Sequence, residues 1–359
     1  MDPARLRAEF PVLERLTYLN AGTCGPLPAA ARRAADEVAD MAELDGRRDA
    51  YYDRFVALRD RQRDAYAALL GASPDDVAVT TSTSDGIARV VAGLELSSRD
   101  EVLVAEREHP SLLGPLLGAA MRSGVRIRTA PRAELVEAVG ADTALVACSH
   151  VGWVTGTVAP DLSELAREVP VLLDGAQGIG AVPVDVRALG CSFYAASGQK
   201  WLCGPVGTGA LYVAPEHRER LAPTTLAYFA YADATRALDP SAVHPTATRF
   251  DTPALAPETV AAALAALDVL GAYGWDRVHA RARELAGRLA AALEASGRRV
   301  APRAQTTLVA WEEADPHAAT ERLDAAGVAV RSVPGSPYLR ASVGAWNDED
   351  DLDRLLAAL

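Results

Sequence analysis

Five short runs of mostly apolar residues, spaced along residues 75–215, set the pattern of this chain. They are DVAVT (76–80), EVLVAE (101–106), VRIRTA (125–130), TALVACS (143–149) and VPVLLD (169–174). Apolar residues follow one another in these runs, which is typical of parallel strands buried on both faces. Helical segments separate the runs, with starts near Asp85 and Pro110 and an amphipathic stretch over 161–169. The pattern predicts an α/β fold built on a doubly wound, mostly parallel sheet.

The remainder of the chain predicts a second, smaller unit. Residues 28–70 are helical with a break around LDGRRDA, and 222–257 are proline-punctuated, as expected of a crossing between domains. Two alanine-rich helices follow, and then strand and helix patterns that run from TTLVAWE to a terminal helix opened by NDED. We expect an N-terminal segment (1–20) packed with the small domain, a large domain (21–245) and a small α+β domain (246–359).

Composition narrows the class of protein. The 359 residues carry a formal net charge of −12 with no basic run, which disfavours a nucleic-acid partner. No apolar stretch reaches membrane-spanning length, and the N-terminus does not resemble a signal peptide, so no membrane partner is expected. The four cysteines show no paired spacing, which indicates neither a disulfide framework nor a metal site. A reducing, cytoplasmic location is expected.

Four polar segments follow predicted strands and would meet at the carboxyl edge of the sheet, where ligands bind in such folds. They are TTSTSDG (80–86), EHPS (108–111), DGAQ (174–177) and SGQK (197–200). Each has an ordinary reading on its own: Ser84 or Asp85 as a helix cap, His109 as a helix-entry residue and Asp174 as a turn residue.

Taken together, these segments match the needs of pyridoxal 5′-phosphate (PLP). Hydroxyls at a helix N-terminus hold a phosphate. A buried Asp174 would keep the pyridine nitrogen protonated, and Lys200 would form a Schiff base with the aldehyde. The imidazole of His109 would stack on the ring, and Gln177 would contact the phenolic oxygen.

The ordered set of motifs resembles the class V, fold-type I PLP enzymes, a family that includes cysteine desulfurases, cysteine C–S lyases and isopenicillin-N-epimerase-like proteins. The resemblance covers nearly the whole chain and is carried by YLNAGTCGPLP, TTSTSDG, EHPS, SHVGWVTG, DGAQGIGAVPVDVRALG, FYAASGQKWLCGPVGTGALYV and YLRASVG. It implies the fold-type I transferase fold and a homodimer, with 249–252 contributing across the interface. It also implies that Lys200, Asp174 and His109 are catalytic, that Gln177, Thr83, Ser84 and Ser197 bind the cofactor, and that Arg340 holds the substrate carboxylate with Asn20 and Trp153 nearby.

Three positions depart from the family pattern. Gln199 stands where the family usually has a histidine before the lysine, and it can still donate an N–H to phosphate. Trp153 stands where many relatives have an asparagine, and the C–S lyases are more similar here. Thr252 is the substitute for a Gly-Thr pair that reaches the neighbouring subunit's phosphate.

The reaction predicted from this resemblance is β-elimination. Desulfurases take sulfur onto a cysteine in a loop before the C-terminal arginine strand, but that loop here, RSVPGSP (331–337), has none. We therefore expect C–S cleavage of cysteine, cystine or an S-substituted cysteine to pyruvate, ammonia and a thiol or persulfide. An epimerase or racemase, an aminotransferase, a desulfurase and a PLP-binding protein without turnover remain alternatives.

Overall fold

A large mixed sheet organises the protein in a computed structural model that describes residues 1–359. Its seven strands lie in the order β2-β8-β7-β6-β5-β3-β4. Every neighbouring pair is parallel except those of β8, which runs antiparallel to β2 and β7. The strands are β2 (Val77–Thr80), β3 (Glu101–Ala105), β4 (Arg126–Ala130), β5 (Thr143–Ser149), β6 (Val171–Asp174), β7 (Phe193–Ser197) and β8 (Gly209–Val213). The predicted doubly wound, mostly parallel sheet is confirmed.

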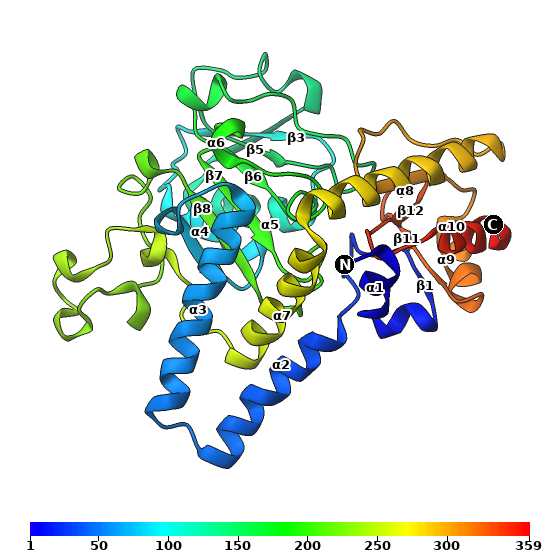
Figure 1. Cartoon of the computed structure of the whole chain (residues 1–359). Helices are drawn as coiled ribbons and strands as arrows, with labels where there is room; N and C mark the ends of the chain where they lie inside the picture. Colours follow the sequence, from blue (N-terminus) through cyan, green and yellow to red (C-terminus); the bar gives the residue numbers. More distant parts are fainter.

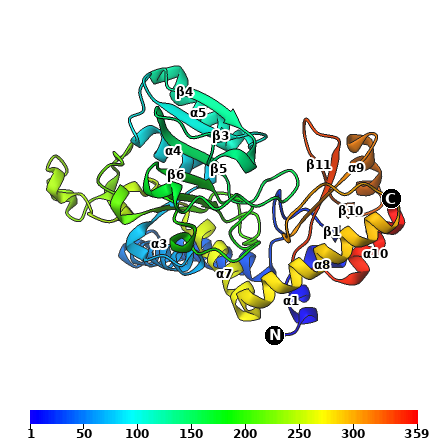
Figure 2. The ribbon, with the colours of Figure 1, turned by 90° about the horizontal axis from the view of Figure 1, so that it is seen from above.

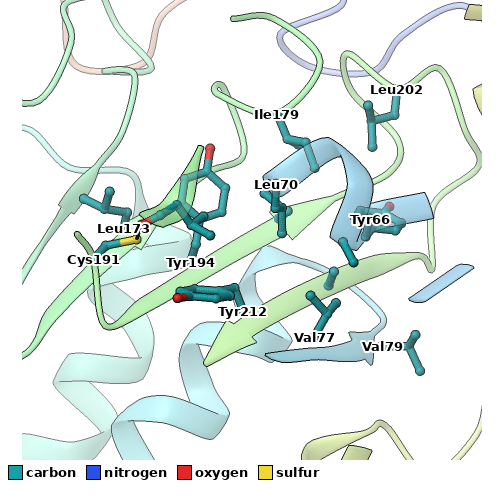
Figure 3. Close-up of a cluster of buried hydrophobic side chains, with 14 of the residues drawn as sticks. Tyr66, Leu70, Val77, Val79, Leu173, Ile179, Cys191, Tyr194, Leu202 and Tyr212 are labelled. Carbon is teal, nitrogen blue, oxygen red and sulfur yellow. Dashed lines mark hydrogen bonds between the residues drawn. The ribbon is translucent and has the colours of Figure 1, made fainter. Parts of the chain in front are cut away.

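Helices cover both faces of this sheet (Figure 1). Successive side chains of a strand point to opposite faces, and on β2 Val77 and Val79 enter one core cluster while Ala78 enters another. Figure 3 shows the first cluster, in which Tyr66 and Leu70 pack near Tyr194 and Tyr212 of the sheet. The helices of this part are α2 (Ala29–Asp40), α3 (Asp49–Leu70), α4 (Thr83–Gly93), α5 (Pro110–Ser123), α6 (Val186–Leu189) and α7 (Pro257–Tyr273). Burial on both faces explains the apolar runs of β2, β3, β5 and β6, whereas the edge strand β4 is mostly exposed.

One predicted helix is not formed. The amphipathic stretch 161–169 contains only a 3-10 turn, η5 (Leu165–Arg167). Pro160 and Pro170 bound this stretch on both sides, and the few residues between them leave little room for helical hydrogen bonds.

The small domain has its own sheet and core. Strands β11 (Arg331–Ser332), β12 (Tyr338–Ser342) and β9 (Leu308–Glu312) pair antiparallel. Helices α8 (Trp275–Ala295), α9 (Pro316–Ala325) and α10 (Glu349–Ala358) accompany them, and α10 begins with a capping box at Asp348. Figure 2 shows this unit beside the large sheet, with α8 running along it. No helix in the structure is long and apolar enough to cross a membrane.

The N-terminal segment lies against the small domain (Figures 1 and 2). Strand β1 (Thr17–Tyr18) pairs in parallel with β10 (Val328–Ala329). Arg7, in α1 (Pro3–Ala8), donates to both carboxylate oxygens of the buried Asp351 in α10. These contacts join both ends of the segment 1–20 to β10 and α10 near the C-terminus.

The proline-punctuated segment 222–257 was expected to cross between the domains, but most of it lies on the large domain. The segment makes short 3-10 turns (Tyr228–Ala230, Ala234–Arg236, Pro240–Ala242 and Ala247–Phe250) and returns to the large sheet. There the Thr252 N–H donates to the carbonyl of Val79 in β2. The helix that follows, α7, still packs against α2 and α3, so the predicted boundary at residue 246 precedes a helix that lies on the large domain.

A buried carboxylate fastens this segment. Both oxygens of Asp251 are occupied: Oδ1 accepts from the Val79 N–H at 3.0 Å and from Arg63 at 3.0 Å, and Oδ2 accepts from Arg59 and Arg63 at 2.7 Å each. Arg59 also lies over the ring of Phe229, 4.1 Å from its centroid. The set joins α3, β2 and the turns of 222–256 through one 2% exposed residue.

We predict that Asp251→Asn lowers the free energy of unfolding by about 3–5 kcal/mol, because it leaves two buried guanidinium groups without their countercharge. Urea denaturation followed by circular dichroism measures this. Asp268→Asn is the matched control. Asp268, in α7, pairs with Arg61, which lies in α3 as Arg59 and Arg63 do, but this pair is exposed. The free energy of unfolding should therefore change by no more than about 1 kcal/mol. Equal effects of the two substitutions would contradict the prediction.

Candidate active site

The polar segments predicted at the carboxyl edge of the sheet do converge on one pocket. Sixteen residues line it, only two of them hydrophobic. Residues from the ends of β2, β3, β6 and β7 meet residues of the small domain and of the N-terminal segment there. Ten of the twelve predicted site residues are among the lining: Thr83, Ser84, His109, Trp153, Asp174, Gln177, Ser197, Gln199, Lys200 and Arg340.

Lys200 and Asp174 form the electrostatic centre of the pocket. Lys200 is the only lysine in the chain. Burial lowers its pKa to about 8, although the nearby Asp174 carboxylate opposes that shift. Burial raises the pKa of Asp174, and Lys200 opposes that in turn. The Oδ1 atom of Asp174 accepts from the Ala176 N–H at 2.9 Å, which fixes the carboxylate at the end of β6. The amine is thus partly neutral near pH 8.

His109 stands at the N-cap of α5 as a neutral imidazole. Its Nδ1 accepts from the Ser111 N–H at 3.1 Å, and burial, followed by the charge of Lys200, lowers its pKa to about 4. The ring of Trp153 meets it edge-on, with centroids 4.9 Å apart and planes at 89°. The Trp153 Nε1–H donates to the carbonyl of Arg107 at 2.8 Å. The two rings form one aromatic wall of the pocket.

Gln177 is held by its neighbours while one of its donors stays free. Its Nε2 donates to the Gly22 carbonyl at 2.7 Å, and its Oε1 accepts from the Trp201 indole at 2.9 Å. An amide nitrogen carries two hydrogens, so the second remains for a ligand oxygen in the pocket.

The pocket also presents hydroxyls at the start of α4. Ser82 caps the helix through the Asp85 N–H at 3.1 Å, which leaves the first N–H groups of α4 directed outward as an anion site. The hydroxyls of Thr83 and Ser197 are buried and have no hydrogen-bond partner, and the same holds for the side-chain oxygen of Gln199. Buried polar atoms without partners are uncommon. The two hydroxyls would be satisfied by donating to a phosphate, whereas the Gln199 oxygen is an acceptor and needs a donor.

A strap of residues 22–25, which follows the N-terminal segment, closes one side of the pocket. Gly22 and Thr23 line it, and the Gly25 N–H donates to the Gln199 carbonyl at 2.7 Å. A Cβ at Gly25 would lie 2.1 Å from the carbonyl oxygen of Lys200, so only glycine allows this approach. The strap therefore ties the segment that precedes it to the lysine loop.

Two arginines of the small domain enter the pocket from adjacent strands. Arg340 on β12 faces Arg331 on β11 in an antiparallel pair, and directly opposed residues point to the same face. Arg340 is 1% exposed, donates to the Trp153 carbonyl and leaves its Nε without a partner. Burial and the charge of Arg331 lower the pKa of Arg340 to about 9. Neither arginine has a carboxylate partner within the chain.

Two predicted site residues lie outside the pocket. The backbone of Asn20 pairs with Ser342, and its Oδ1 accepts from the Thr23 hydroxyl at 2.7 Å, so Thr23 takes the position at the pocket. Thr252 is 6% exposed beside β2, which leaves little of it available to a neighbouring subunit. Thr23 lies in the stretch 20–25 that the sequence placed at the entrance to the site, although Asn20 was the residue singled out there. Sequence reasoning missed Arg331, which lies on the strand that forms a hairpin with the Arg340 strand.

None of the four cysteines lines the pocket. Cys148, Cys191 and Cys203 are buried, and burial raises the pKa of Cys148 and Cys191 to about 12. Cys24, which belongs to the strap, is partly exposed. The turn 333–337 before β12 is short and has no cysteine.

Comparisons with known proteins agree with this geometry. Residues 20–355 match the family described as aminotransferase class-V. The chain is 31% identical to the isopenicillin N epimerase of Streptomyces clavuligerus, over 95% of this chain and 93% of that protein. It is 34% identical to a probable cysteine desulfurase of Methanothermobacter thermautotrophicus, over 62% of this chain and 58% of that protein. The chain belongs to the class-V aminotransferase family.

Solved structures of the protein C-DES are similar to the whole chain. One is a C-DES variant with glycine covalently linked to its PLP cofactor, with a TM-score of 0.91 and 27% identity over 98% of both chains. Another is the complex of the cystine C–S lyase C-DES with its reaction product cysteine persulfide, with a TM-score of 0.91 and 26% identity over 97% of this chain and 98% of that one. The expected fold-type I architecture is confirmed, and the protein is a PLP-dependent enzyme.

The residues present fit this cofactor. Thr83, Ser197 and the first turn of α4 would hold its phosphate, Asp174 its ring nitrogen and Lys200 its aldehyde carbon. When bound, PLP supplies an electron sink for negative charge at the α-carbon of an amino acid. These individual roles stay predictions, and the unpartnered hydroxyls are the observation that supports them.

We predict that the apo protein captures PLP faster as pH rises, with a midpoint near the Lys200 pKa of about 8. Only the neutral amine of Lys200 would be nucleophilic toward an aldehyde. Stopped-flow absorption of the protein-linked cofactor measures the rate. Asp174→Asn should lower the midpoint, because the carboxylate stabilises the ammonium form. Lys200→Ala, which has no lysine left, should show no such band, and a band there would refute the assignment.

Proposed function

We propose that this enzyme is a C–S lyase that eliminates sulfur from the β-carbon of a disulfide-linked amino acid such as cystine. The observation that carries the proposal is the pair of arginines, Arg331 and Arg340, which share one face of the pocket and lack carboxylate partners. Cystine has two carboxylates, whereas cysteine has one. Two guanidinium groups in one pocket suit the substrate with two.

Lys200 serves as the base in this proposal. A neutral amine beside the substrate removes the α-proton, and its pKa of about 8 places it near the pH at which a base is effective. Burial raises the pKa of the Asp174 carboxyl, and the charge of Lys200 and the Ala176 N–H both oppose that shift. Loss of the α-proton is followed by departure of the β-sulfur as a persulfide, and water converts the released enamine to pyruvate and ammonia.

Arg340 would hold the α-carboxylate. Its Nη1 is already fixed on the Trp153 carbonyl, and its Nε is buried without a partner. A planar guanidinium with one edge fixed presents its other donors to a carboxylate in a set orientation. Arg331 is half-buried and donates only to the Thr23 hydroxyl at 3.2 Å, so it is free for a second, more distal carboxylate.

Two of the alternatives lack a group that their reaction needs. A desulfurase needs a nucleophilic cysteine at the substrate, and none lines the pocket. An epimerase needs a second acid to return the proton from the opposite face, yet the only lining carboxyl group is Asp174, and His109 has a pKa of about 4. An aminotransferase remains a candidate on residues alone, and product analysis separates it.

The deciding experiment supplies purified protein and PLP with cystine, cysteine, S-methylcysteine and isopenicillin N. Pyruvate, sulfide, persulfide and the amine form of the cofactor are measured separately. Pyruvate and persulfide from cystine in equal amounts are the expected products. Alanine from cysteine would establish a desulfurase, inverted substrate an epimerase, and accumulated amine cofactor an aminotransferase.

We predict that Arg340→Ala lowers kcat/KM for cystine and S-methylcysteine alike by roughly thirty- to several-thousand-fold, from about 2–5 kcal/mol for one partner of a buried charged pair. The cofactor spectrum should stay unchanged, since the side chain holds substrate. Steady-state kinetics with saturating PLP measure the effect.

Arg331→Ala should discriminate between the two substrates. The loss of a charged hydrogen bond, about 1.5–3 kcal/mol, predicts a roughly ten- to hundredfold lower kcat/KM for cystine and little change for S-methylcysteine. Arg322→Ala, an exposed arginine of the same domain, serves as the control and should leave both unchanged. Equal losses for both substrates after Arg331→Ala would remove the case for a second carboxylate.

We also propose a homodimer, on the strength of the family resemblance and of exposed apolar side chains such as Leu27 and Val206. Sedimentation velocity measures the state, and a fully active monomer would contradict it.

A further inference from the structure

We propose that Glu108 is a positioning residue for the aromatic wall of the pocket. It acts on Arg107 and Trp153 through the backbone of the loop 106–109, and it thereby sets the place that the cofactor ring occupies. The proposal depends on cofactor binding alone and is independent of which reaction follows.

The carboxylate of Glu108 is buried and fully engaged. Its side chain is 0% exposed. Oε1 accepts from the Ser149 N–H at 3.0 Å and from Arg132 Nη2 at 2.6 Å, and Oε2 accepts from the Ser149 hydroxyl. Arg132 closes the set by donating to the Ser149 carbonyl at 2.6 Å. The loop after β3 is therefore fixed to the end of β5, whose last residue, Ser149, pairs with Asp174.

The contacts of Glu108 affect the backbone conformation of the preceding residue, Arg107. Arg107 has a φ of +60°, in the left-handed region that L residues other than asparagine and aspartate rarely adopt. Its side chain is exposed and forms no ion pair, so the side chain does not account for the conformation. We attribute it to the buried carboxylate on the next residue, whose contacts with Ser149 and Arg132 fix the position of the loop between β3 and α5.

The left-handed turn directs a carbonyl at the aromatic wall. The Arg107 oxygen accepts from the Trp153 Nε1–H at 2.8 Å, and Trp153 holds its edge against His109 at 4.9 Å. His109 itself follows Glu108 directly in the chain. The buried Glu108 carboxylate thus fixes both rings. It holds His109 because that residue follows it in the chain, and it holds Trp153 through the hydrogen bond to the Arg107 carbonyl.

Charge near the anchor requires Arg132. Burial raises the pKa of the Glu108 carboxyl, the charge of Arg132 and the Ser149 hydrogen bonds oppose that shift, and Asp174 adds a smaller upward contribution. An ion pair that served stability alone could be replaced by apolar residues at little cost. Here the pair also carries two backbone contacts of Ser149, and neutral groups of the same size would not reproduce that geometry.

The test compares apo proteins reconstituted with PLP. The variants are Glu108→Gln, which keeps the shape and removes the charge, and Ser149→Ala, which removes only one donor to Oε2. Glu101→Gln is the matched control. Glu101 begins β3, pairs with Arg128, and lies at the opposite end of the same strand from the pocket. Absorption titration gives the PLP dissociation constant, and calorimetry of the apo proteins gives the unfolding temperature.

We expect Glu108→Gln to weaken PLP binding by about ten- to a hundredfold, the size seen when supporting partners of a metal ligand are removed. Ser149→Ala should weaken it by a few fold, and Glu101→Gln should leave it unchanged. An unchanged dissociation constant in Glu108→Gln would overturn the proposal. If that variant fails to fold, an unchanged constant in Ser149→Ala overturns it instead.

A merely structural role is separated by a cycle with Trp153→Phe, which keeps a ring and removes the Nε1–H. If Glu108 acts through the Arg107–Trp153 hydrogen bond, Glu108→Gln should weaken PLP binding less in the Trp153→Phe protein than in the parent. Fully additive losses would mean that the carboxylate acts by another route, and this outcome also overturns the proposal.

Discussion

A lysine amine and a carboxylate buried in the same pocket are the constraint on which the rest of the site depends. A buried amine alone would lose its proton, and a buried carboxylate alone would gain one. Lys200 and Asp174 each oppose the shift that burial imposes on the other. The two come from the ends of different strands, β6 and the loop after β7, so the parallel sheet is what brings them together.

The surrounding groups serve that pair without adding net charge to it. His109 is neutral, Gln177 and Gln199 are amides, and the anion site at α4 uses hydroxyls and N–H groups. The positive charges stand apart, on the small domain, as Arg331 and Arg340. The side of the pocket formed by the large sheet is therefore nearly neutral, and the side formed by the small domain is cationic. This arrangement suits a ligand with an anionic group directed at the small domain.

The sequence was most informative where short-range chemistry determines structure. Unbroken apolar runs predicted the parallel strands, and hydroxyls before a helix predicted the start of α4, because burial and capping are read from neighbouring residues. The path of 222–256 was not predictable, since it follows from Asp251 meeting Arg59 and Arg63 of a distant helix. Arg331 was missed for a similar reason: only strand register shows that it faces Arg340. Thr23 lines the pocket and Asn20 does not, because the Asn20 side chain is held by the hydroxyl of Thr23. The sequence alone does not show this turn.

The single lysine has a further consequence for protein chemistry. A chain of 359 residues with one lysine offers an endoprotease specific for lysine one cleavage point, which would separate residues 1–200 from 201–359. In the folded protein that peptide bond is covered by the strap at Gly25 and by the buried Trp201. Cleavage therefore requires the strap and the lysine loop to open, and its rate reports how often the folded chain exposes its own catalytic centre.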